Sequence, residues 1–152
     1  MSQVYFEDVE PGKEIPAVKE HCDSRRLVMW AAAVGDFYQI HYDKDYAQST
    51  GLPERIVHGS LKHALLGRLI HEWVSPGGRV IKFGCQYRGM DGVNTDVICR
   101  GVITKKYQEG GQNLVELDIW TETGKPNDDA RPKNPEGIKT TPGTAVVALP
   151  KR

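Results

Sequence analysis

Two short segments hold the residues best suited to chemistry. Asp36 and His41 stand five residues apart in the run GDFYQIHYD, and the run IVHGS, residues 56–60, follows after a short gap. A carboxylate and an imidazole can hold one water between them and take a proton from it. The second run reads as the start of a helix, where backbone N–H groups near Gly59 can polarise a carbonyl. Together the two segments indicate the addition or removal of water.

Two predicted helices flank and contain these segments. Ser24–Val34 is rich in alanine, with Ser24 as the expected N-cap and Gly35 placed to end it. A longer helix is predicted from His58 to Trp73, before the breaker run SPGG. Its apolar residues do not form one narrow stripe, so we expect this helix to be covered on more than one side.

β-rich runs follow the helices, and they predict an antiparallel sheet. Alternation in LVELDI is typical of a half-buried hairpin strand. The predicted strands are Lys13–Val18, Arg79–Tyr87, Thr95–Lys106, Asn113–Thr123 and Thr144–Leu149. We therefore expect an α+β fold in which the sheet curls around the long helix. Residues 1–152 are predicted to form one domain, with residues 124–143 as a long loop rich in proline and glycine inside it.

The composition limits the partners and the cellular location that we expect for the protein. Twenty basic and twenty acidic residues give a formal net charge of zero, which does not favour nucleic acid or an anionic membrane as a partner. The three cysteines are widely spaced, which indicates a reducing compartment. The sequence shows no secretory signal and no run of roughly 20 apolar residues. These features predict a cytoplasmic protein.

The run AVGDFYQIHYDKDYAQSTGLPERIVHGSLKHAL closely resembles the hydratase signature of the MaoC-like dehydratases. This family includes the (R)-specific enoyl-CoA hydratases and has the hot-dog fold, an antiparallel sheet wrapped around a long central helix. One departure stands between the acid and the base, where Tyr38-Gln39 replaces the family's Asn-Pro. The matching positions are Gly35-Asp36, His41-Tyr42-Asp43, Ala47, Gly51 and Ile56-Val57-His58-Gly59.

The resemblance implies an activity and a set of roles. Asp36 and His41 take the positions of the catalytic pair, and Gly59 takes the position whose amide binds the thioester oxygen. Tyr38, His58 and Ser60 are expected to contact the substrate. The expected reaction is reversible hydration of a 2-enoyl thioester, a carbon–oxygen lyase step of fatty acid metabolism. Coenzyme A is expected as part of the substrate, with no redox cofactor and no metal, and the family implies a homodimer or a larger assembly of dimers.

Other interpretations of the same residues stay open. A hot-dog thioesterase would use Asp36 to activate water against the thioester carbonyl, and a noncatalytic acyl-binding or partner subunit would have lost the chemistry through the altered Tyr38-Gln39 loop. His41, Asp43 and His58 suggest a metal site, but their spacing matches no standard ligand arrangement. Asp43 and Ser60 can instead cap helices.

Overall fold

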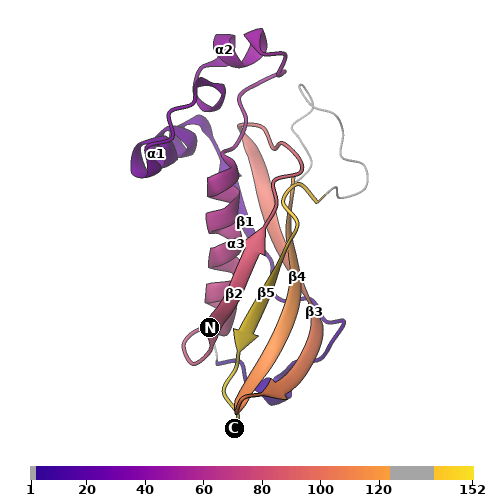
Figure 1. Cartoon of the computed structure of the whole chain (residues 1–152). Helices are drawn as coiled ribbons and strands as arrows, with labels where there is room; N and C mark the ends of the chain where they lie inside the picture. The colour runs from indigo at the N-terminus through magenta and orange to yellow at the C-terminus, as the bar shows by residue number, and fades with distance from the viewer. Residues whose placement is uncertain (1–2, 124–138) are drawn as a thin grey trace.

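A curved antiparallel sheet of five strands dominates the computed structural model, which describes residues 3–123 and 139–152 (Figure 1). The strand order is β1-β3-β4-β5-β2, and all neighbouring strands run antiparallel. β3 and β4 form a long hairpin whose turn uses Gly110 and Gly111, both with positive φ. The strands are β1 (Val18–Cys22), β2 (Arg79–Cys85), β3 (Thr95–Glu109), β4 (Gln112–Thr123) and β5 (Gly143–Ala148). The predicted antiparallel sheet is confirmed.

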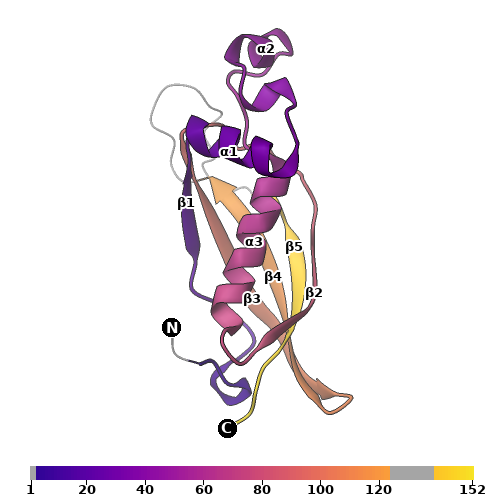
Figure 2. The same ribbon diagram turned by 90° about the vertical axis from the view of Figure 1, so that its left-hand side faces the viewer.

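The longest helix, α3 (Gly59–Val74), runs along the concave face of this sheet (Figures 1 and 2). Its apolar stripe packs against the inward residues of β3 and β4 and forms the centre of the core. The buried residues of α3 are Leu61, Lys62, Leu65, Leu66, Leu69, Ile70, Trp73 and Val74. His63, Ala64 and Arg68 on the opposite side are exposed. The buried residues thus spread over more than half of the helix circumference, as the absence of one narrow stripe predicted, and one face of the helix stays exposed in the described chain.

Short helices cover the end of the molecule where α3 begins (Figure 2). They are α1 (Ser24–Val34), the 3-10 turn η2 (Gln39–His41) and α2 (Lys44–Ser49), while another 3-10 turn, η1 (Phe6–Asp8), lies near the N-terminus. The predicted bounds of α1 are confirmed, but its N-cap is Asp23, whose Oδ1 accepts from the N–H of Arg26 at 2.8 Å. Gly35 ends the helix at φ +73°, a conformation that favours glycine.

The first strand is the one element that the sequence misplaces. Residues 13–15 do bond to β3, through an isolated bridge between Glu14 and Val102 and backbone hydrogen bonds of Lys13 and Ile15. Pro16 has no N–H to donate, and the regular strand β1 begins only at Val18, where the prediction ends. The other predicted strands agree with the structure to within three residues at each end. Of the predicted loop 124–143, residues 124–138 lie outside the described residues.

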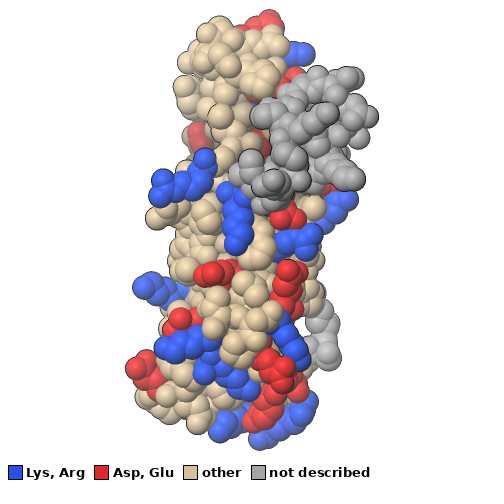
Figure 3. Space-filling model, turned by 90° about the vertical axis from the view of Figure 1, so that its right-hand side faces the viewer, with Lys and Arg blue, Asp and Glu red and all other residues tan. Residues whose placement is uncertain are grey.

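Charged side chains of both signs share the surface. On the face shown in Figure 3, basic and acidic side chains are interspersed over the sheet, so this face does not present a field of one sign. Among the described residues, none of the helices combines the length and apolar character that a membrane crossing requires.

Candidate active site

The turn after α1 places Asp36 near the start of α3. Gly35 reverses the chain in a left-handed conformation, and Asp36 follows as a half-buried residue. Its Oδ1 accepts a long hydrogen bond of 3.4 Å from the N–H of Tyr38. This bond leaves most of the acceptor capacity of the carboxylate available for other donors.

His41 ends the η2 turn and has a defined tautomer. Its ring is 7% exposed, and Nδ1 lies 2.7 Å from the carbonyl oxygen of Ile56. A carbonyl oxygen only accepts, so Nδ1 carries the hydrogen. In the neutral imidazole Nε2 is then an acceptor, as a general base requires.

His58, the residue before α3, is fully buried beneath His41. The two rings stack with their centroids 3.8 Å apart and their planes 20° from parallel. Nε2 of His58 donates to the backbone carbonyl of Asp36 at 3.3 Å, and Nδ1 has no hydrogen-bond partner in the described part of the chain. Burial, reinforced by the neighbouring His41, lowers the pKa of His58 although Asp36 opposes the shift. His58 is therefore neutral at pH 7.

This shift predicts a loss of stability in acid. The unfolded chain takes up a proton on His58 near pH 6.5, before the folded protein does, so stability is fully present above that pH and falls below it. In His58→Gln, we expect the free energy of unfolding to fall less steeply with decreasing pH than in wild type between pH 6.5 and pH 5. The two slopes should differ by up to about 1.4 kcal/mol per pH unit. Urea unfolding measures both slopes. Equal slopes in wild type and His58→Gln would contradict the assignment.

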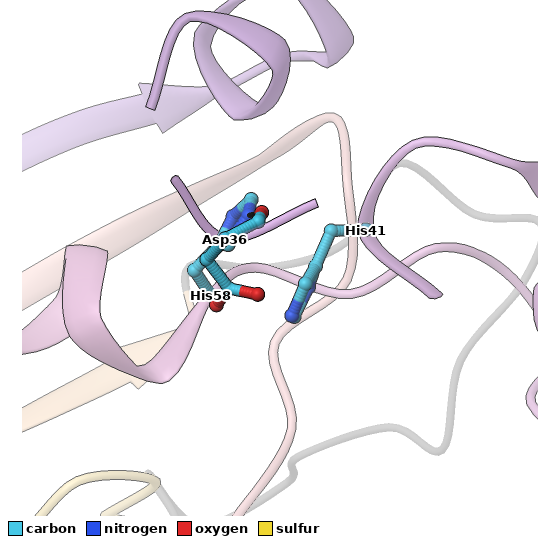
Figure 4. Close-up of side chains that lie close together, drawn as sticks. All are labelled: Asp36, His41 and His58. Atoms are coloured by element: carbon cyan, nitrogen blue, oxygen red, sulfur yellow. Dashed lines mark hydrogen bonds between the residues drawn. The ribbon is translucent and has the colours of Figure 1, made fainter. Parts of the chain in front are cut away.

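Asp36, His41 and His58 form one cluster (Figure 4). One potential ligand atom from each lies within 4.8 Å of the others, and no other such group occurs among the described residues. Lone pairs of imidazole nitrogens lie in the ring plane, so two nearly parallel stacked rings direct them side by side and not toward one ion. The arrangement suits a shared water better than a tetrahedral metal. Asp43, the third residue of the metal site considered from sequence, caps α2 by accepting from the N–H of Tyr46 at 3.0 Å.

Gly59 opens α3 directly beside the cluster. No side chain caps the helix, and the first N–H that finds an intrahelical acceptor belongs to Lys62, which donates to His58 O at 3.2 Å. A Cβ on Gly59 would lie 3.1 Å from ring atoms of Tyr87. A side chain at position 59 would therefore press on the Tyr87 ring, whereas glycine fits beside it.

The two remaining predicted substrate contacts, Tyr38 and Ser60, differ in their surroundings. Tyr38 is 52% exposed, with its ring centroid 6.3 Å from that of His41 and 6.1 Å from that of Tyr46. The hydroxyl of Ser60 accepts from the indole N–H of Trp30 at 2.9 Å, which links α1 to the start of α3. Ser60 thus does not cap the helix. The Ile56 carbonyl and the Tyr87 ring were missed from sequence, because neither a backbone acceptor nor a tertiary contact leaves a motif.

A family model of the MaoC like domain matches residues 7–117 of this sequence, and these residues contain the whole cluster. The chain belongs to the MaoC-like domain family. A curated relative, an (R)-specific enoyl-CoA hydratase of Rhodospirillum rubrum, is 27% identical over 107 residues, which cover 67% of this chain and 74% of the relative.

Solved structures similar to this MaoC-like chain share its hot-dog fold. The unliganded R-hydratase PhaJ1 of Pseudomonas aeruginosa superposes with a TM-score of 0.81 at 21% identity, covering 99% of this chain and 88% of PhaJ1. The (R)-hydratase of A. caviae involved in PHA biosynthesis gives 0.76 at 21% identity, covering 95% and 99%. A chain of the ChsH1-ChsH2 complex of Mycobacterium tuberculosis gives 0.71 at 18% identity, covering 92% and 98%.

Proposed function

We propose that this MaoC-like protein catalyses the reversible hydration of a 2-enoyl thioester, most simply a coenzyme A ester. The observation that carries the proposal is the cluster at the start of α3, where Asp36 and His41 both offer acceptors and lie within 4.8 Å of each other. The hydratase relatives support the substrate class.

The two acceptors fit the two hydrogens of one water. In the proposed reaction the water donates one hydrogen to the carboxylate of Asp36 and the other to Nε2 of His41, so that a lone pair faces C3 of the enoyl group. One O–H bond breaks as the C3–O bond forms, and the protonated acceptor returns a proton to C2. The product is a 3-hydroxyacyl thioester, and the reverse sequence is the dehydration.

The negative charge that moves onto the thioester oxygen must be stabilised by hydrogen-bond donors. The unpaired N–H groups at the start of α3, with that of Gly59 first, supply them together with the positive end of the helix dipole. The buried, neutral His58 holds the backbone of Asp36 through its 3.3 Å bond and places no positive charge against the His41 ring. Hydration leaves the overall oxidation state unchanged, so the proposed reaction needs no redox cofactor.

We also propose a homodimer. β2 is an edge strand, and its Val80 and Ile81 are 40% and 47% exposed. An exposed apolar edge is suited to pairing with the same strand of a second copy. Light scattering coupled to size exclusion should give twice the chain mass of 17.0 kDa.

Incubation with crotonyl-CoA distinguishes the proposed function from its alternatives. A hydratase lowers the absorbance of the conjugated enoyl thioester without releasing thiol, and a thioesterase releases coenzyme A that a thiol reagent detects. A noncatalytic acyl-binding subunit gives neither signal. Loss of enoyl absorbance without free thiol is the expected result.

Tyr38 is expected to select the acyl chain. Its exposed ring lies at the edge of the cluster and makes no hydrogen bond to Asp36 or His41 through its side chain in the structure. In Tyr38→Asn, we expect the ratio of kcat/KM between hexenoyl-CoA and crotonyl-CoA to change about 10-fold, the worth of a few apolar contacts. The rate with the better substrate should stay within about threefold. An equal loss of rate for all chain lengths would contradict a pocket role.

A further inference from the structure

A buried ion pair lies one helical turn below the candidate site. Lys62 of α3 and Asp91 of the segment between β2 and β3 are 2% and 0% exposed, and Nζ lies 2.8 Å from Oδ2. Among the described residues, no other ion pair has both side chains buried. Neither residue has a role in the chemistry proposed above.

The pair binds three parts of the fold together. Nζ of Lys62 also donates to the carbonyl of Gly89 at 2.8 Å, and the hydroxyl of Thr123 at the end of β4 donates to Oδ1 of Asp91. α3, the 89–91 segment and β4 are therefore held at one point by charge-assisted hydrogen bonds.

The backbone at Asp91 and Gly92 connects the ion pair to the candidate site. Asp91 O accepts from the N–H of Val57 at 2.7 Å, and Ile56 forms a bridge with Gly92. The carbonyl of Ile56 in turn accepts the Nδ1 hydrogen of His41 at 2.7 Å. A continuous chain of contacts thus leads from the ion pair to the imidazole.

Stability alone does not explain such a pair, because a protein is often equally stable when apolar residues of similar size replace a buried ion pair. We infer that Lys62 and Asp91 are positioning residues that hold the Ile56 carbonyl where it keeps His41 in the Nδ1–H tautomer. A free imidazole favours the Nε2–H form, in which Nε2 cannot accept a proton, so the carbonyl must be held in place to maintain a base. The use of this base rests on the proposed function, whereas the tautomer does not.

The double variant Lys62→Met, Asp91→Leu tests the inference without leaving one charge buried alone. In protein labelled with ¹⁵N-histidine, long-range ¹H–¹⁵N spectra at pH 8 identify the tautomer of each imidazole. We expect wild-type His41 to show the Nδ1–H pattern and the double variant to shift toward Nε2–H. With crotonyl-CoA, kcat should fall on the order of 10- to 100-fold while KM stays within about threefold.

A control replaces an ion pair that lies away from the site. Lys105→Met, Glu116→Gln removes a cross-strand pair between β3 and β4 and should leave both the His41 tautomer and kcat as in wild type. If the Lys62, Asp91 variant does not fold, Thr123→Val removes one hydroxyl donor to Asp91, and the same spectral shift is expected in smaller degree. An unchanged His41 tautomer in a folded variant overturns the inference whatever kcat does. A wild type that shows the Nδ1–H tautomer but does not hydrate crotonyl-CoA would overturn the proposed function alone.

Discussion

Replacing Asp36 with asparagine is expected to slow crotonyl-CoA hydration by about 100- to 10,000-fold, the usual worth of a positioned general base. The amide keeps the size of the carboxylate and can still accept the 3.4 Å bond from the N–H of Tyr38, so the fold should be retained. It cannot take a proton from water. The loss should therefore appear in kcat, with KM changed little.

Asp43→Asn is the matched control, because it makes the same chemical change seven residues later. Asp43 caps α2 through the N–H of Tyr46, and asparagine caps a helix about as well as aspartate. Its rate should stay within about twofold of wild type. Equal rates for folded Asp36→Asn and Asp43→Asn would show that Asp36 is not the base.

His41→Asn is the second variant with a large expected effect. The amide nitrogen of asparagine can replace Nδ1 as the donor to the Ile56 carbonyl, but nothing replaces Nε2. We expect kcat to fall by about 100- to 10,000-fold in a protein that still folds. The rate of crotonyl-CoA hydration and the far-ultraviolet circular dichroism of the variant measure the two parts of this expectation.

Its control is His71→Asn, at an exposed position near the other end of α3, which should keep the wild-type rate. Combining Asp36→Asn with His41→Asn should slow hydration little more than the worse single change, because the two groups act on one water. If the two losses multiplied in full, the residues would act independently and a shared water would be excluded.

The sequence predicted an element of the fold well where a single residue determines the local backbone conformation. Gly35 ends α1 because a left-handed conformation is needed there, and Gly110 and Gly111 close the β3–β4 hairpin for the same reason. The first strand was predicted too early. Residues 13–15 also hydrogen-bond to β3, but Pro16, which has no N–H to donate, separates them from the regular ladder of Val18–Cys22. The extent of the buried face of α3 likewise depends on how far the sheet curls around it.

The candidate site was predictable as a set of residue types but not as a set of contacts. The motif pointed to Asp36, His41 and Gly59, and the structure brings Asp36 and His41 together with His58 at the start of α3. The stacking of the two imidazoles, and the buried pair that links α3 to the 89–91 segment, join residues many positions apart. Such contacts arise from tertiary packing, which local spacing does not encode.

The destination of the water oxygen tests the central claim most directly. Crotonyl-CoA turned over in H₂¹⁸O should yield 3-hydroxybutyryl-CoA with one ¹⁸O in the hydroxyl at C3, as fragmentation in a mass spectrometer shows, and no labelled carboxylate. The Asp36→Asn protein should give the same label at a rate lower by about 100-fold or more. Label in a free carboxylic acid, or none in either product, would contradict the account.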